Sequence, residues 1–260
     1  MSAFQTFLAE TPGKDASVFI WAAFITGKYA NIFLKATWVT LYVAVLGTLL
    51  GYLLGFLVGV INTTKPGPED NLAKRVLLRL LRGIVWLYVE VFRDTPMIVQ
   101  GMVVYYGLRQ NGIMIASAAA GILVTLLNTG AYMGETVRGG INSVDPGQEE
   151  GALAMGMSHV GAMFYVIIPQ ALKNIFPEMG NTFMNNLKMT SVLNVIGVSE
   201  LFLSAKTAGG SYYKYFEAYI VIAIIYFVLC FLFNRGFLWL EKKMAGKADY
   251  ALAAEYLDND

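Results

Sequence analysis

Residues Ala36 to Ile61 form a run of 26 residues without a charged side chain. A helix of about 20 apolar residues is enough to cross the hydrocarbon core of a bilayer. Within the run, Gly47, Gly51, Gly55 and Gly59 recur at every fourth position and therefore share one helix face. Because glycine has no side chain, such a face lets another helix approach closely. The run predicts a transmembrane helix whose glycine face packs on protein.

Composition extends this prediction to the whole chain. Of its 260 residues, 57% are hydrophobic and only 14% are charged, and the mean hydropathy is +0.55. These values are typical of an all-α integral membrane protein, with lipid as a partner. A net charge of +1 provides no basic surface for nucleic acid. The single cysteine, Cys230, and single histidine, His159, exclude an intramolecular disulfide and leave metal binding without a ligand set.

Four further segments complete a prediction of five transmembrane helices, at residues 76–108, 113–134, 177–202 and 218–240. The first of these would be roughly 50 Å long as one helix, against a core of about 30 Å. We expect it to break at Arg93-Asp94-Thr95-Pro96, because proline removes a backbone donor and disfavours helical geometry before it. Broken backbone at membrane depth has to face protein or a wet cavity.

The helix expected at 177–202 is unusually polar. Asn181, Asn185 and Lys188 lie at helical spacing and are expected to form one stripe. Because polar groups in lipid are costly, the stripe should line the bundle interior or a passage. The expected division of the chain is an extracytoplasmic or interfacial segment at 1–35, with a short apolar helix at Val18–Ile25, a transmembrane domain at 36–240, and a cytoplasmic tail at 241–260.

Basic residues predict the orientation of these five spans. With the tail inside, the inner segments hold eleven Lys and Arg residues and the outer segments hold six. Cytoplasmic loops carry the excess of basic residues in membrane proteins. The N-terminus is therefore expected outside and the C-terminus in the cytoplasm. The same orientation puts residues 146–170 in the cytoplasm.

The segment at 146–170 lies between two apolar spans but is too interrupted to be one. The acidic residues Glu149 and Glu150 lie near its start, glycine recurs through it, and Pro169 lies near its end. Two short helices around a turn near Gly156 are the simplest interpretation. An element of this kind suits docking to a partner.

Glu150-Gly151-Ala152, followed after three residues by Gly156 and after nine more by Val166-Ile167-Ile168-Pro169, resembles the EAA loop of bacterial ABC-importer permeases. Gly151 replaces the first alanine of that pattern but keeps every spacing. The resemblance implies that this loop binds the importer's ATPase. The docking residues that it implies are Glu149, Glu150, Gly151, Ala152, Gly156, Ile168 and Pro169.

Three other segments are similar to the polar-amino-acid branch of these permeases. They are Phe92–Gln100, with Asp94 in place of a glycine, Ala131–Ile141, and Lys188–Val192, with Met189 where aspartate is usual. The substrate path expected from them consists of Thr95, Gln100, Thr182, Met189, Thr190 and Ser191, with helix packing as an equally open role for each. Glu135 and Arg138, three residues apart, are expected to form a structural ion pair.

The resemblance implies a permease subunit that carries a polar amino acid of the glutamine, glutamate, histidine, arginine or cystine class across the bacterial inner membrane. An extracytoplasmic binding protein would deliver the substrate. The expected partners are two ATP-binding subunits and a second permease, identical or homologous. No Gly-x4-Gly-Lys-Ser/Thr stretch occurs in the sequence, so ATP and Mg²⁺ are expected on the partner ATPase. The chain itself is expected to be no enzyme and to hold no cofactor.

Two other classes remain open at this stage. An ATP-independent secondary transporter or channel would need an ion-coupling site or a repeated half. The sequence shows no internal repeat and few carboxylates within the apolar segments. A membrane enzyme would need a constellation of Ser/His/Asp, Cys/His or metal ligands, which the sequence lacks.

Overall fold

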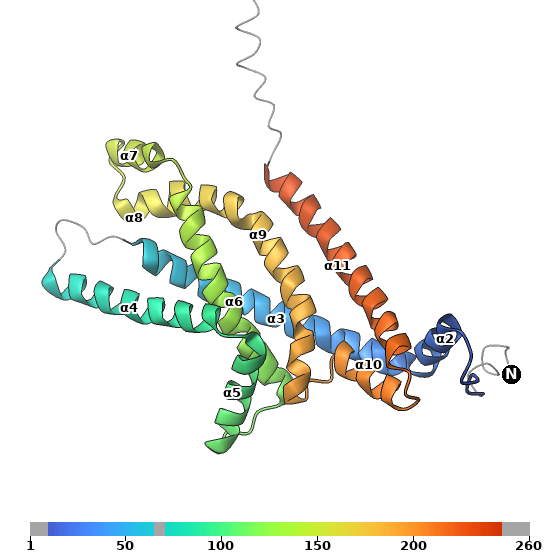
Figure 1. Cartoon of the computed structure of the whole chain (residues 1–260). Helices are drawn as coiled ribbons and strands as arrows, with labels where there is room; N and C mark the ends of the chain where they lie inside the picture. The colour runs from blue at the N-terminus through green and yellow to red at the C-terminus, as the bar shows by residue number, and fades with distance from the viewer. Residues whose placement is uncertain (1–9, 65–70, 246–260) are drawn as a thin grey trace, which may run out of the picture.

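A computed structural model describes residues 10–64 and 71–245, and this part of the chain consists of helices and their connections (Figure 1). The helices are α2 Val18–Lys28, α3 Ala30–Thr63, α4 Leu72–Asp94, α5 Met97–Gln110, α6 Ser117–Asn142, α7 Pro146–Ala154, α8 His159–Ala162, the π-helix η1 Met163–Ile167, α9 Ile168–Met189, the 3-10 helix η2 Thr190–Ile196, α10 Leu201–Gly210 and α11 Tyr215–Ala245. Most of the expected cytoplasmic tail, residues 246–260, lies outside the described residues.

Helices α3 and α6 form the central pair of the bundle, crossing at its middle (Figure 1). The glycine face of α3 lies directly on α6, as the sequence predicts. A Cβ atom built on Gly51 would be 2.5 Å from Thr129 Cβ, and one on Gly55 would be 2.5 Å from Met133 Cβ. Side chains at the glycine positions would therefore force the two helices apart.

The break expected near Pro96 is confirmed. Helix α4 ends at Asp94, and α5 begins at Met97 after Pro96 in extended geometry. In Figure 1 the two helices run in clearly different directions from this point. The chain therefore does not continue as one straight helix from residue 76 to residue 108.

Among the differences between the helix boundaries and the expected spans, two concern α6 and α9. Helix α6 starts at Ser117 and continues to Asn142, past the apolar run, and carries the Glu135–Arg138 ion pair in this extension. The expected span at 177–202 is not one helix. Helix α9 already begins at Ile168, with Pro177 inside it, and ends at Met189.

A turn of 3-10 helix and a sharp bend follow α9. Gly197 adopts a φ of +81°, which favours glycine and stops the helix. Glu200 is fully buried at the start of α10, where its carboxylate accepts hydrogen bonds of 2.8 Å from the backbone N–H groups of Phe202 and Leu203. Tyr226 donates a third bond to it from α11. The chain therefore restarts as α10 in a new direction.

Helix α2, the first helix of the described residues, is part of the bundle. Trp21, Phe24 and Ile25 of α2 are buried in a cluster with residues of α3, α10 and α11. Helix α3 begins at Ala30, so the boundary expected between residues 35 and 36 falls inside a helix. An apolar segment too short to span the membrane here gains stability by packing on its neighbours.

Two helices of the described chain are long and apolar enough to cross a membrane by themselves. They are α3 and residues Tyr215–Met244 of α11, with mean hydropathies of 2.3 and 2.5. A third candidate is the stretch from His159 to Ile196 together with α10, which bends by 56°. Helices α4 and α6 are not among these candidates, so the count of five crossings stays a prediction.

Candidate substrate cavity and docking loop

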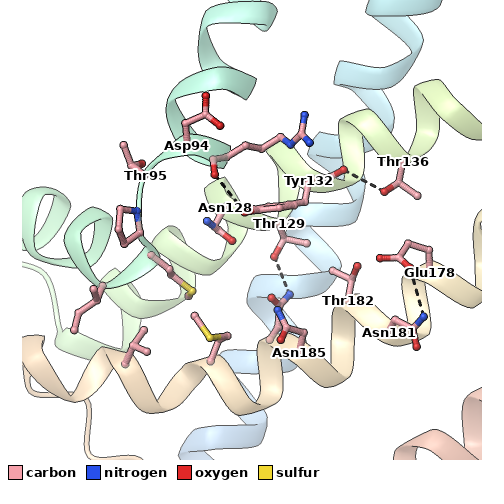
Figure 2. A pocket seen from close by; sticks show the side chains of 17 residues that line it. Asp94, Thr95, Asn128, Thr129, Tyr132, Thr136, Glu178, Asn181, Thr182 and Asn185 are labelled. Atoms are coloured by element: carbon pink, nitrogen blue, oxygen red, sulfur yellow. Dashed lines mark hydrogen bonds between the residues drawn. The ribbon is translucent and has the colours of Figure 1, made fainter.

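A cavity of about 720 Å³ lies between α6, α9 and the break between α4 and α5. Figure 2 shows polar side chains of α6 facing those of α9 across it. The lining residues are Arg93, Asp94, Thr95, Pro96, Met97, Ile98, Asn128, Thr129, Tyr132, Thr136, Glu178, Asn181, Thr182, Asn185, Asn186, Met189 and Val192. The helix break therefore faces a polar space, as broken backbone within a membrane protein requires.

The polar stripe of α9 is real, but its members differ from those expected. Glu178, Asn181, Asn185 and Met189 follow one another at helical spacing along the cavity wall. Lys188 does not line it and is exposed elsewhere on the helix. On a period of 3.6 residues, residue 188 lies about 20° from residue 181, just beyond the edge of the arc that the lining residues of α9 cover.

The side chain of Gln100 supplies hydrogen-bond donors to the backbone carbonyl groups at the helix break beside Pro96. Proline has no N–H, so the carbonyl oxygen of Phe92 loses its helical donor. The side-chain amide of Gln100 donates to Phe92 O and Thr95 O, both at 2.9 Å. Asn128 of α6 donates to Gln100 Oε1 at 3.1 Å and so ties the break to the next helix.

Replacement of Gln100 by leucine is expected to destabilise the break. Thr95 O would lose this donor, and Phe92 O would keep only the 3.3 Å bond from Asn128, so hydrogen bonds worth about 0.5–1.5 kcal/mol each are lost. The thermal midpoint of the detergent-solubilised protein measures the effect. Gln110→Leu is the control, because Gln110 is exposed at the end of α5. Equal midpoints for the two variants would contradict this role of Gln100.

The expected path residues divide into two groups in the structure. Thr95, Thr182 and Met189 line the cavity. Gln100, Thr190 and Ser191 do not; Gln100 lies behind the break, and Thr190 is buried with its hydroxyl bonded to Leu187 O at 2.8 Å.

The α6 wall of the cavity was missed by sequence reasoning. It consists of Asn128, Thr129, Tyr132 and Thr136, which recur at helical spacing, the first three inside the uncharged span. This periodic polar pattern is the signal that would have identified it. Buried Asn186 of α9 donates to Thr129 Oγ1 and to Thr48 Oγ1 at 2.8 Å each, and so joins α9 to both α6 and α3.

Glu135 and Arg138 form an ion pair with an oxygen-to-nitrogen distance of 2.7 Å. Two further hydrogen bonds of 3.2 Å from Arg138 Nε make the contact well oriented. Arg93 approaches the same carboxylate only to 3.9 Å. The pair lies beside the cavity but is not part of its lining.

The loop at 146–170 folds into two short helices around a tight turn. Asp145 caps α7 by accepting a 2.7 Å hydrogen bond from Gly147 N. After α7, Gly156 N donates to Leu153 O at 2.9 Å and Met157 N to Ala152 O at 3.1 Å. This is a Schellman motif, and the φ of +88° at Gly156 is the left-handed geometry that it needs.

Polar side chains tie this loop to the helices of the bundle. His159 Nδ1 lies 3.3 Å from Glu149 Oε1 and joins α8 to α7. Gln170 of α9 donates to Gln148 of α7 at 3.2 Å. Asn174 of α9 donates to Ser143 at the end of α6 at 2.9 Å. These bonds connect α8 to α7, α7 to α9, and α9 to the end of α6.

Most of the implied docking residues are accessible. Glu150, Gly151, Gly156 and Pro169 are exposed, Glu149 and Ile168 are half-buried, and Ala152 is buried. The loop also exposes apolar side chains that no sequence motif indicates, which are Met155, Val160, Phe164 and Tyr165, at 79%, 67%, 58% and 78%. Exposed apolar residues grouped on one element are typical of an interaction surface.

The helical fold, the polar cavity and the exposed loop together define a membrane transport subunit. The chain belongs to the family described as binding-protein-dependent transport system inner membrane component, whose model matches residues 72–246. It is a permease of an ABC importer and an inner-membrane protein.

Relatives and a solved structure agree with this family. The arginine transport system permease protein ArtQ of Bacillus subtilis is 38% identical over 57% of this chain and 69% of its own length. The "Probable glutamine ABC transporter permease protein GlnM" of the same species is 34% identical over 64% and 79%. A crystal structure of an amino acid ABC transporter with histidines matches 83% of this chain and 95% of the solved chain, at 36% identity and a TM-score of 0.74.

Proposed function

We propose that this chain imports a polar amino acid, driven by ATP that a separate subunit hydrolyses. The observation that carries the proposal is that one helix, α9, both lines the polar cavity and contacts the exposed loop of α7 and α8. Two ATP-binding subunits, which hold ATP and Mg²⁺, bind the loops of two permeases, identical or homologous. An extracytoplasmic binding protein delivers the amino acid. The relatives named for arginine and glutamine support this substrate class.

Reconstitution tests this function. The complex purified through a tag on this chain is expected to contain an ATPase and to accumulate a labelled polar amino acid in liposomes only when ATP and the binding protein are supplied. Full transport by this chain alone, without ATP, would instead support a secondary transporter or channel.

We also propose that the chain crosses the membrane five times with its N-terminus outside. The excess of basic residues in the inner segments supports this topology. In this orientation α7 and α8 face the cytoplasm, where an ATPase reaches them. The turn between α10 and α11 faces outward.

Cysteine labelling tests the orientation. Because Cys230 is the only cysteine, a Cys230→Ser background leaves no other thiol. Met155→Cys in the docking loop and Tyr213→Cys after α10 both introduce exposed positions, at 79% and 88%. A membrane-impermeant maleimide is expected to label Tyr213→Cys in intact cells and Met155→Cys only after permeabilisation. The opposite pattern would place the docking loop outside and exclude the proposed mechanism.

A further inference from the structure

The first half of α4 carries positive charge and no negative charge. Lys74, Arg75, Arg79 and Arg82 all lie in its first three turns, and the first acidic residue of the helix is Glu90. The three arginines follow one another at positions i, i+4 and i+7, so they form one row along the helix. Guanidinium groups bind phosphate oxygens in a bidentate manner. The arginine row therefore suits a partner that carries phosphate.

Arg82 has a buried nitrogen without a protein acceptor. Its side chain is half-buried, and its Nε donates to no hydrogen-bond acceptor within residues 10–64 and 71–245. Arg79, one turn earlier, is exposed and forms no ion pair within the same residues. A guanidinium group that is partly removed from water without an opposite charge is costly. A negative charge from outside the chain would compensate it.

The side of α4 away from the arginine row is apolar and uncovered. The helix contacts the bundle through Val85 and Val89, which are buried with Val58 of α3. On a period of 3.6 residues, the apolar face is centred about 150° from the arginine row and about 140° from these two valines. Its side chains expose 56%, 62%, 67% and 57% of their surface, and they are Leu77, Leu80, Ile84 and Leu87. The apolar face therefore points away from the bundle.

The position of this segment fits the edge of a bilayer. In Figure 1 the first half of α4 extends past the other helices on the side where α3 ends. Among the described helices, α4 is not one of those apolar enough to cross a membrane alone. Trp86, one turn after Arg82, is 61% exposed, and tryptophan is enriched where acyl chains meet headgroups. A helix with one basic side and one apolar side binds at that boundary.

We propose that residues 72–87 of α4 form a binding site for anionic phospholipid. The arginine row binds the phosphate of the headgroup, and the apolar face inserts among the acyl chains. A second copy of this chain that docked through the same face would bring a second row of like charge, because a two-fold interface pairs identical patches. The site goes beyond amino-acid import and does not depend on which substrate is carried. Under the proposed orientation, the bound lipid belongs to the inner leaflet.

Photo-crosslinking in nanodiscs tests this site. The whole complex is reconstituted in phosphatidylcholine with a small fraction of a probe lipid, which is phosphatidylglycerol or phosphatidylcholine with the same diazirine-bearing acyl chain. Mass spectrometry measures the labelling of α4 relative to that of α11, whose exposed Phe227 and Leu232 report general lipid contact. We expect the ratio to be about tenfold higher with the anionic probe, because each basic residue near the surface adds attraction for anionic lipid.

Charge variants assign this preference to the arginine row. Arg79→Gln combined with Arg82→Gln is expected to abolish the difference between the two probes. Lys35→Gln combined with Lys206→Gln is the matched control, because it removes two exposed positive charges outside α4 and should leave the ratio unchanged. Arg79→Gln alone serves if the double variant fails to fold, since Arg79 is exposed; it is expected to lower the ratio by about fivefold.

Three results would overturn the inference. Equal labelling of α4 by both probes would mean that the helix contacts acyl chains without recognising the headgroup. Labelling of α11 but not of α4 would mean that a second permease or another subunit covers the apolar face. An unchanged ratio in the folded arginine variants would place the preference elsewhere. The proposed function is measured separately, by ATP-dependent uptake, and its failure would leave these labelling ratios as they are.

Discussion

A Gly55→Leu substitution is expected to prevent stable folding of the transmembrane bundle. A Cβ atom at this position alone would lie 2.5 Å from Met133 Cβ and 3.0 Å from the backbone nitrogen of Gly134. Backbone cannot rotate away as a flexible side chain does, so α3 and α6 have to separate. Even the smaller change Gly55→Ala should cost about 1–3 kcal/mol, the usual effect of an overpacked contact.

The amount of monodisperse protein after detergent extraction measures this effect. Gly83→Leu is the matched control, since a Cβ atom at Gly83 in α4 meets no other atom within 4 Å. We expect Gly83→Leu to extract like the unmodified protein and Gly55→Leu to aggregate or be degraded. Normal extraction of both variants would contradict this prediction, because the bundle would then fold even with α3 and α6 forced apart.

The second large effect is expected at the docking loop, where Gly156→Val should release the ATPase. Gly156 has a φ of +88°. A left-handed backbone costs a residue with a side chain roughly 1–2 kcal/mol, and a β-branched residue is a genuine outlier there. The Schellman turn would open, and α8 would lose its fixed position relative to α7.

Gly151→Ala provides an unusually close control, five residues earlier. Gly151 lies inside α7, and a Cβ atom there meets nothing within 4 Å. Alanine in a helix interior is favoured over glycine by roughly 0.5–1 kcal/mol, so α7 should become firmer. The ratio of ATPase to permease after affinity purification is expected to fall for Gly156→Val and to be maintained for Gly151→Ala. Equal loss in both variants would mean that the loop needs small residues for contact and not for its turn.

The features that depend on local chemistry could be predicted from the sequence. The glycine spacing in residues 47–59 predicted the contact face of α3, and Pro96 predicted the end of α4. Gly156 predicted the turn between two short helices. Each of these depends on the conformational limits of one residue type or on a fixed helical period.

Features that depend on partners distant in sequence could not be predicted in the same way. Gln100 was expected in the substrate path, but it satisfies Phe92 O because Pro96 leaves that carbonyl without a donor. Helix α9 was expected to continue to residue 202, but Glu200 begins α10 with the help of Tyr226, 26 residues later. The polar wall on α6 only becomes recognisable once α9 is placed opposite it.

Helix α9 connects the two regions on which the proposed mechanism depends. It leaves the docking loop at Ile168, where Gln170 contacts α7, and reaches the cavity at Asn185. At 1.5 Å per residue, these ends of the segment are about 26 Å apart. A tilt of about 10° at the loop would therefore shift Asn185 by about 4–5 Å, given this helical rise. That displacement exceeds the length of a hydrogen bond, so under the proposed function a small rotation imposed at the loop is enough to make or break contacts between the cavity wall and a substrate.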